Sequence, residues 1–242
     1  MTTVKLLPDV ASEHLKEPKP LIAGVKDVPV MRKWKGKDVV TEQSVYIRLR
    51  DQRGIHVSRL TGLLMRYENR DLTQKSTQKL VEELSKTHDT HATFVCKWEC
   101  IERGLRVGRK IEVSDALYMT VVLPYVSTCP CAAAMCKAVG RGVPHQQRSR
   151  MTVTTVWTDV DVAEVLVGLF QMPRTVMKRK EELEWCIEAV KPEHLVFAED
   201  AARRIGEALE EVGISEYLVQ TEHFESLHQH SMIAVNRRGR FI

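Results

Sequence analysis

The sequence predicts an α+β protein in which antiparallel strands alternate with helices. Two observations indicate this class. Several stretches alternate apolar and polar residues, as paired strands do, and other stretches repeat their apolar residues every three or four positions, as helices do. The 242 residues are 43% hydrophobic, which is enough for a real core in one large domain or two smaller ones. No sequence repeat is visible, but the order of elements would allow two structurally similar halves that meet near residues 131–142.

The expected strands are short runs rich in β-branched residues or alternating in polarity. We expect them at residues 45–49, 93–101, 110–122, 151–157, 217–219 and 232–235, with a turn containing Gly104 and Gly108 after the second.

The expected helices lie at residues 73–86, 161–170, 181–190 and 194–212. Thr73 is a suitable N-cap for the first of them, and Gly213 is a stop signal for the last. Cys186 shares an apolar face with Leu183 and Ile187, so we expect it to be packed against the core.

Composition narrows the class of protein. The formal net charge is only +4, which suits an anionic small ligand as well as a weak nucleic-acid contact. No apolar run is long enough to span a bilayer and the N-terminus lacks the layout of a signal peptide, so we expect a soluble, cytoplasmic protein without a membrane partner. In such a compartment the six cysteines are expected to be free, buried or metal-bound.

Residues 127–150 hold the first cluster of reactive side chains. Pro130 fixes its own φ and makes the backbone of Cys129-Pro130-Cys131 stiff and turn-like. Gly140 and Gly142 then let the backbone turn before His145. A soft sulfur and an imidazole nitrogen in one connection suit Zn²⁺ or a similar transition metal. Arg148 and Arg150 follow, and they are placed to hold an anion nearby.

A second cluster spans residues 222–230 and contains three of the nine histidines together with Glu222 and Glu225. In an extended chain Glu222, His228 and His230 share one face, and Glu225 lies on the other. A bulge near Ser226 could bring Glu225 and His228 together. The residues alone leave open a solvent-exposed strand end, a metal site and a catalytic cluster.

Three segments in order resemble the type IB GTP cyclohydrolase I family. Residues 53–59, Arg-Gly-Ile-His-Val-Ser-Arg, are similar to a K-G-I-H-M-S-R motif. Residues 129–131 and 145–149 are similar to C-P-C followed by H-N-Q-R-S, and residues 222–230 to E-H-F-E-S-I-H-N-H. The resemblance covers about Val28 to Val235.

The resemblance implies a tunnelling fold: two tandem modules of antiparallel sheet with helices packed on one face. We expect a flexible segment at residues 1–25 and a bimodular catalytic domain at 26–242, with modules of about 26–135 and 136–242. Subunits of such proteins assemble into a barrel with active sites between subunits, so a homotetramer or larger even oligomer is expected. Departures from the family pattern are Ala132 after C-P-C, a longer connection to His145, Pro144 before it, and Lys178–Glu182 in place of K-R-P-D-E.

The implied reaction is hydrolytic opening of the guanine imidazole ring of GTP at C8 with formate release. One divalent metal (Zn, Mn or Fe) per subunit would lower the pKa of water to about 7 for this attack. By resemblance Cys129 and His145 are metal ligands, a glutamate near residue 164 is the third, with Glu164 the only one in that region, and Cys131 lies beside the ligand.

The resemblance also implies roles around the substrate. Glu225 would accept two hydrogen bonds from guanine N1–H and N2–H₂, His228 and His230 would move protons, and Glu181 would assist acid–base steps. Candidate cations for the triphosphate are Arg53, His56, Arg59, Arg148, Lys178 and Arg179.

Two other functions remain open. A sister enzyme of the same fold, a nitrile reductase of the 7-deazaguanine pathway, would use a cysteine nucleophile and a nicotinamide cofactor, but no dinucleotide-binding glycine motif is present. A non-catalytic, metal-dependent nucleotide- or RNA-binding protein is compatible with the charge, although no stacking motif or basic stripe supports nucleic-acid binding. The sequence does not distinguish dihydroneopterin triphosphate from a cyclic phosphate product, or assign the product to folate, 7-deazaguanine or methanopterin synthesis.

Overall fold

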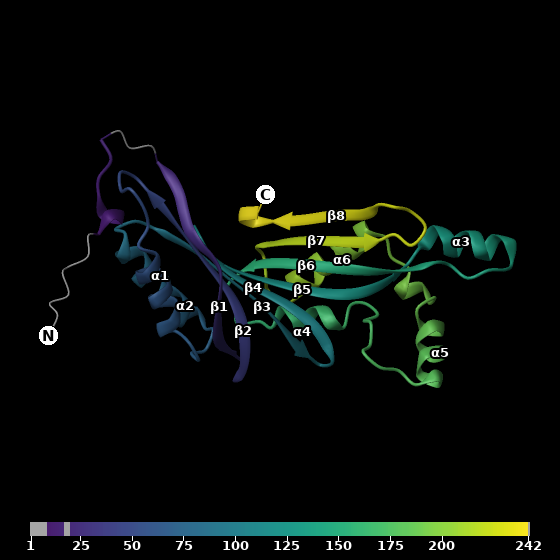
Figure 1. The fold of residues 1–242 in the computed structure, drawn as a ribbon. Coiled ribbons are helices and arrows are strands. Elements are labelled where there is room, and N and C mark those ends of the chain that lie inside the picture. Colours follow the sequence, from purple (N-terminus) through teal and green to yellow (C-terminus); the bar gives the residue numbers. More distant parts are fainter. Residues whose placement is uncertain (1–8, 17–19, 242) are drawn as a thin grey trace. The chain divides into compact units, whose positions relative to one another are not determined.

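The computed structural model describes residues 9–16 and 20–241 (Figure 1). The chain is an α+β protein with an antiparallel sheet whose strand order, β1 to β8, follows the order of the chain. This confirms the expected fold class. Contacts divide the chain into two compact units, which are residues 1–98 with 110–117 and residues 99–109 with 118–242. Among the described residues, no helix is both long enough and apolar enough to cross a membrane.

The first unit consists of a strand hairpin, a third strand and a helix pair. The elements are β1 (Leu21–Trp34), β2 (Lys37–Leu49), α1 (Val57–Arg66), α2 (Gln74–Thr87) and most of β3 (Ala92–Glu102). Lys35 and Gly36 both have positive φ, as a two-residue hairpin turn between β1 and β2 requires. Thr73 caps α2 by accepting a hydrogen bond from the Ser76 amide, as expected.

The second unit contains the longer strands and the remaining helices. Its elements are most of β4 (Leu105–Val113), β5 (Leu117–Thr128), α3 (Pro130–Val139), β6 (Gln146–Val156), α4 (Val162–Val167), α5 (Arg179–Glu188), α6 (Ala198–Glu211), β7 (Tyr217–Phe224) and β8 (Ser231–Arg238). The inward face of α6 packs with α4 on buried residues of β5, β6 and β7, including Leu123, Met151 and Val219. This core fixes the three strands whose ends carry the reactive residues.

Three expectations about elements are wrong. The strand expected at 110–122 is broken by a turn at 114–116, where the Ser114 amide donates to the Ala116 carbonyl. The connection between Cys129 and His145, where we expected no helix, contains α3. Cys186 is not packed: no residue of α5 is buried, and Leu183 and Ile187 are 61% and 57% exposed.

The two compact units of the structure have different boundaries from the two expected modules. Because β3 and β4 each contribute to both compact units, the units do not follow the expected modules of about 26–135 and 136–242. In the segment expected to be flexible, residues 1–8 and 17–19 lie outside the described residues. Residues 9–16 form hydrogen bonds with residues 51–54, and β1 already begins at Leu21.

Candidate active site

Cys129 and His145 meet where the hairpin of β5 and β6 ends. The two strands pair in register down to Thr128 and Gln146, and the next residues continue the contact, with the Cys129 amide donating to the His145 carbonyl at 3.2 Å. Cys129 is also the N-cap of α3, and its Sγ accepts from the Ala132 amide at 3.5 Å. The structure therefore joins the backbones of the two predicted ligand residues directly.

The turn between β7 and β8 adds a carboxylate to this place. Ser226 Oγ lies 3.3 Å from His145 Nδ1, and Gln147 Nε2 donates to Glu225 Oε1 at 3.3 Å. Glu225 is half-buried, as are Cys129 and His145. Three segments that are distant in sequence thus place a thiol, an imidazole and a carboxylate at one end of the sheet.

A buried polar group lies beneath Glu225. Its centre is His223, which is 2% exposed and faces Tyr125 Oη at 2.8 Å through Nε2. His223 Nδ1 faces Ser127 Oγ at 3.3 Å and Gln147 Nε2 at 3.5 Å. Burial lowers the pKa of His223 to about 4, so the ring is neutral at physiological pH.

The other side chains of the two clusters are more exposed. His228 and His230 stack with ring centroids 5.1 Å apart at 13° in the exposed turn between β7 and β8. Of the two arginines expected to hold an anion, Arg150 already forms an ion pair with Glu222. Arg148 is exposed, and so is Cys131 in the first turn of α3.

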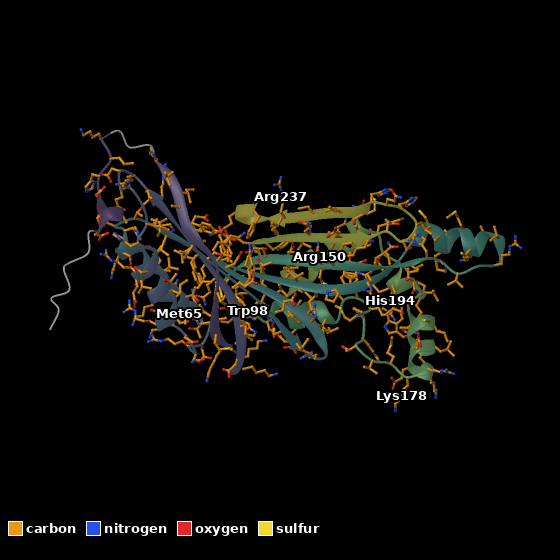
Figure 2. The ribbon with its side chains drawn as sticks, viewed as in Figure 1. Met65, Trp98, Arg150, Lys178, His194 and Arg237 are labelled. Carbon is orange, nitrogen blue, oxygen red and sulfur yellow. The ribbon has the colours of Figure 1, made fainter. Side chains whose placement is uncertain are left out.

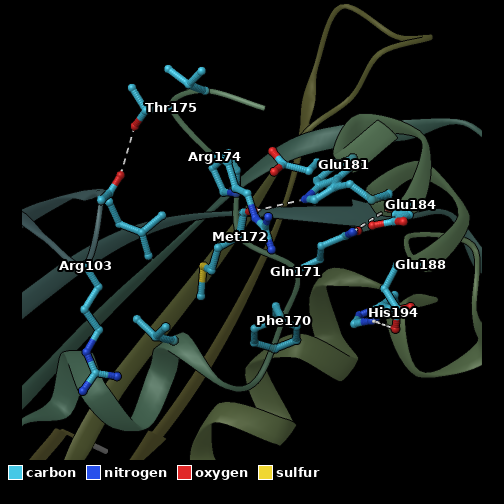
Figure 3. A pocket seen from close by; sticks show the side chains of 16 residues that line it. Arg103, Phe170, Gln171, Met172, Arg174, Thr175, Glu181, Glu184, Glu188 and His194 are labelled. Carbon is cyan, nitrogen blue, oxygen red and sulfur yellow. Dashed lines mark hydrogen bonds and ion pairs between the residues drawn. The ribbon is translucent and has the colours of Figure 1, made fainter. Parts of the chain in front are cut away.

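A cavity of about 710 Å³ lies beside α5 in the same unit (Figure 3). Glu181 lines it and accepts a hydrogen bond from the Lys178 amide at 3.0 Å. Lys178 and Arg179 lie at the start of α5 and do not line the cavity, whereas His194, beyond the other end of the helix, does (Figure 2).

The carboxylates available for a metal centre are at two different places. Glu164 lies on α4 and is paired with Arg103, and it does not form a close ligand group with Cys129 and His145. Within the described part of the chain, one group of three ligand-type side chains lies close together: Glu188, Glu193 and His194, with ligand atoms within 4.8 Å of one another.

Glu188 belongs to a segment that contacts the residue before Cys129. Thr128 Oγ1 donates to the Ala189 carbonyl at 2.7 Å, and the Val196 amide donates to the Thr128 carbonyl at 3.2 Å. The hydrogen bond from Lys191 lowers the pKa of Glu188, with His194 adding a smaller contribution, so Glu188 is ionised at neutral pH. Glu188 is absent from the ligands expected from the sequence, because the family resemblance points to the helix before Lys178.

The remaining predicted cations lie in the first unit and are held by the N-terminal segment. Arg53 pairs with Glu13 at 2.7 Å and Arg59 with Asp9 at 2.9 Å. His56 Nδ1 lies 3.4 Å from the same Asp9 carboxylate. Asp9 therefore faces both His56 and Arg59, and Glu13 faces Arg53.

The antiparallel α+β fold thus places a thiol, an imidazole and a carboxylate, residue types suited to hydrolytic chemistry, at one end of the sheet. The chain matches the family model of type I GTP cyclohydrolase folE2 over residues 7–234. A protein named GTP cyclohydrolase FolE2 from Pseudomonas putida (strain GB-1) is 25% identical over 298 residues, covering 98% of this chain and 97% of that protein. Its namesake from Halorhodospira halophila (strain DSM 244 / SL1) is 27% identical over 249 residues, covering 90% and 93%. The chain therefore belongs to the type I GTP cyclohydrolase folE2 family, which confirms the resemblance.

Proposed function

We propose that the chain is a GTP cyclohydrolase that opens the guanine ring at C8 and yields 7,8-dihydroneopterin triphosphate, a pterin precursor. One water is consumed overall and C8 leaves as formate. The observation that carries the proposal is the meeting of Cys129, His145 and the Glu225 turn at the ends of β5, β6 and β7. These are the residue types that ring hydrolysis needs, namely metal donors beside an acceptor for the base.

Cys129 and His145 fit a divalent transition metal. Thiolate and imidazole are donors suited to Zn²⁺ and related ions, and the backbone contact between the two residues holds their side chains on adjacent strand ends. A bound ion would supply Lewis acidity, lowering the pKa of water so that it can attack C8. Ser226 lies against His145 Nδ1 and would orient the ring.

The carboxylate that completes the protein shell is Glu164 or Glu188. The family pattern indicates the first, while the contact between Ala189 and Thr128 places the backbone of the second close to Cys129. Glu164→Gln and Glu188→Gln each replace a carboxylate by an amide of nearly the same size. Metal content measured by mass spectrometry in the two purified variants therefore shows which of the two glutamates binds the metal. The variant that loses metal identifies the ligand, and the other serves as its matched control.

Glu225 is proposed as the guanine anchor. A carboxylate can accept from N1–H and N2–H₂ at once, and a half-buried site strengthens that pair. His228, His230 and Glu181 are proposed to move protons to and from the opening ring, with Cys131 beside the metal. Among the described residues Arg148, Lys178 and Arg179 make no ion pair, which supports a role toward phosphate alongside Arg53, His56 and Arg59.

We also propose that the enzyme works as a homotetramer or larger even oligomer. β8 is the last strand of the sheet order and exposes Met232, Ile233 and Val235, of which Ile233 is 55% exposed. An edge strand that exposes apolar side chains favours pairing with a neighbouring subunit. Sedimentation of the metal-loaded protein tests this, and an active monomer would contradict it.

The function is tested by incubating GTP with protein reconstituted with Mn²⁺, Fe²⁺ or Zn²⁺ and analysing the products by mass spectrometry. We expect formate and dihydroneopterin triphosphate in equal amounts. A cyclic phosphate product would revise the product assignment. NADPH oxidation with a nitrile substrate, or tight RNA binding without GTP turnover, would instead identify the protein as a reductase or a binding protein.

A further inference from the structure

The amide of Gln147 lies between a buried histidine and the proposed guanine anchor. Its Nε2 is 3.3 Å from Glu225 Oε1 and 3.5 Å from His223 Nδ1. Gln147 and His223 are 6% and 2% exposed, so neither group has ready access to water. Both residues follow the strand period: Gln147 lies two residues after His145 on β6, and His223 two residues before Glu225 at the end of β7.

Hydrogen-bond chemistry fixes the direction of these contacts. A carboxylate oxygen only accepts, so the nitrogen of the Gln147 amide must face Glu225. The same nitrogen only donates, so its contact with His223 is favourable only when Nδ1 carries no proton. The proton of the neutral ring then sits on Nε2 and is donated to Tyr125 Oη at 2.8 Å. Ser127 Oγ, 3.3 Å from Nδ1, can donate to the same nitrogen.

We propose that Tyr125, His223 and Gln147 form a buried relay that orients Glu225, and that this relay sets the specificity of the site for guanine. The inference rests on the proposed function of Glu225 as the guanine anchor. Gln147 occupies one acceptor position of Oε1, which prevents the carboxylate from rotating freely. The remaining acceptor positions then face the place where the N1–H and N2–H₂ groups of the base must arrive.

These three residues are positioning residues, because none of them touches the substrate in the proposed arrangement. Tyr125 holds the tautomer of His223, the tautomer makes Nδ1 an acceptor, and that acceptor holds the Gln147 amide. Each member comes from a different strand, β5, β7 or β6, so the geometry depends on sheet register rather than on a loop. Ser149 extends this buried hydrogen-bond network, because its Oγ lies 2.9 Å from Ser127 Oγ.

The first test measures the tautomer directly. In zinc-loaded full-length protein, ¹⁵N NMR of the histidine rings should show His223 protonated at Nε2 and unprotonated at Nδ1 at neutral pH. Tyr125→Phe removes the acceptor for Nε2–H and should increase the Nδ1–H form. A wild-type ring protonated at Nδ1 would overturn the relay. This measurement needs no GTP turnover, so it stands even if the proposed activity fails.

The second test uses kinetics. Gln147→Leu should raise the KM for GTP by about tenfold, the value of one lost hydrogen bond to a charged group, with little change in kcat. Gln146→Leu is the matched control, since it removes the same amide from the neighbouring position on β6, and its KM should stay unchanged. Tyr125→Phe should raise KM in the same direction by a smaller factor. Loss of kcat alone, or equal KM values for both glutamine variants, would refute a positioning role.

Discussion

Replacing His223 by glutamine should change how the free energy of unfolding depends on pH. Burial lowers the pKa of His223 from 6.5 to about 4, and the Glu199 carboxylate opposes this only weakly. The folded protein therefore binds fewer protons than the unfolded chain between those two values. The stability contributed by the neutral ring is present above pH 6.5 and is lost as the pH falls toward 4.

The size of the effect follows from the two pKa values. Each pH unit between them corresponds to about 1.4 kcal/mol, so protonation of this one ring should remove about 3 kcal/mol between pH 6.5 and pH 4. His223 is 2% exposed, so solvent screens this effect little. Two other ionisable features lie near the ring. Tyr125 stays neutral between pH 4 and pH 6.5, because burial raises its pKa, and Glu222, the residue before His223 on β7, is paired with Arg150.

The assay is urea unfolding followed by tryptophan fluorescence at several pH values, with protein concentration and metal content held constant. Subtracting the His223→Gln curve from the wild-type curve removes the contributions of other acids and of His88, whose pKa is also lowered by burial. His230→Gln, in the exposed turn, should leave the wild-type dependence intact. A wild-type minus His223→Gln difference that is the same at pH 7 and pH 4.5 would refute the reasoning.

Three further outcomes are expected. Cys129→Ala should lose metal and activity together, because it removes the thiolate donor; full metal content in that variant would exclude Cys129 as a ligand. Glu225→Gln should lower GTP turnover by about two orders of magnitude while metal content stays intact, and Glu222→Gln should leave GTP turnover near the wild-type level. Wild-type enzyme should reject ATP, because ATP lacks the N1–H and 2-amino donors. Asp9→Asn combined with Glu13→Gln should lower the KM for GTP, most clearly at low salt, because the two carboxylates compete with phosphate for the cations of residues 53–59; an unchanged KM at low salt would contradict this.

The parts of the fold that could be predicted are those with strong local signals. The amphipathic pattern of α6 and the threonine cap of α2 are set by neighbouring residues, and both are confirmed. α3 was missed although its signals are present: Cys129 as N-cap, Pro130 at the first position and Gly140 in the left-handed conformation at the end. Proline and glycine around a short alanine run are helix boundaries here, but the same residue types also favour turns, so the sequence alone does not separate the two.

Other errors arose because burial depends on what packs against an element. Leu183, Ile187 and Val190 of the α5 region repeat at helical spacing, yet the described chain leaves them exposed. Periodicity shows that a face is apolar, but it does not show whether the same chain or a neighbour covers it. The site was predicted from motifs, which gave Cys129, His145 and Glu225. Gln147, His223 and Glu188 are linked to the candidate site by contacts between distant segments, and spacing along the chain does not reveal such contacts.

Apart from Lys178–Glu182, the departures of this sequence from the family pattern fall in the connection between Cys129 and His145, beyond the paired ends of β5 and β6. Cys129 and His145 are held together by pairing at the ends of β5 and β6 and by the bond between the Cys129 amide and the His145 carbonyl. Everything between them, including Ala132, Cys136 and Pro144, projects beyond that bond as α3 and its return. Because the two strand ends set the spacing of the donors, a longer connection changes what α3 can contact and not the distance between the two residues proposed to bind the metal.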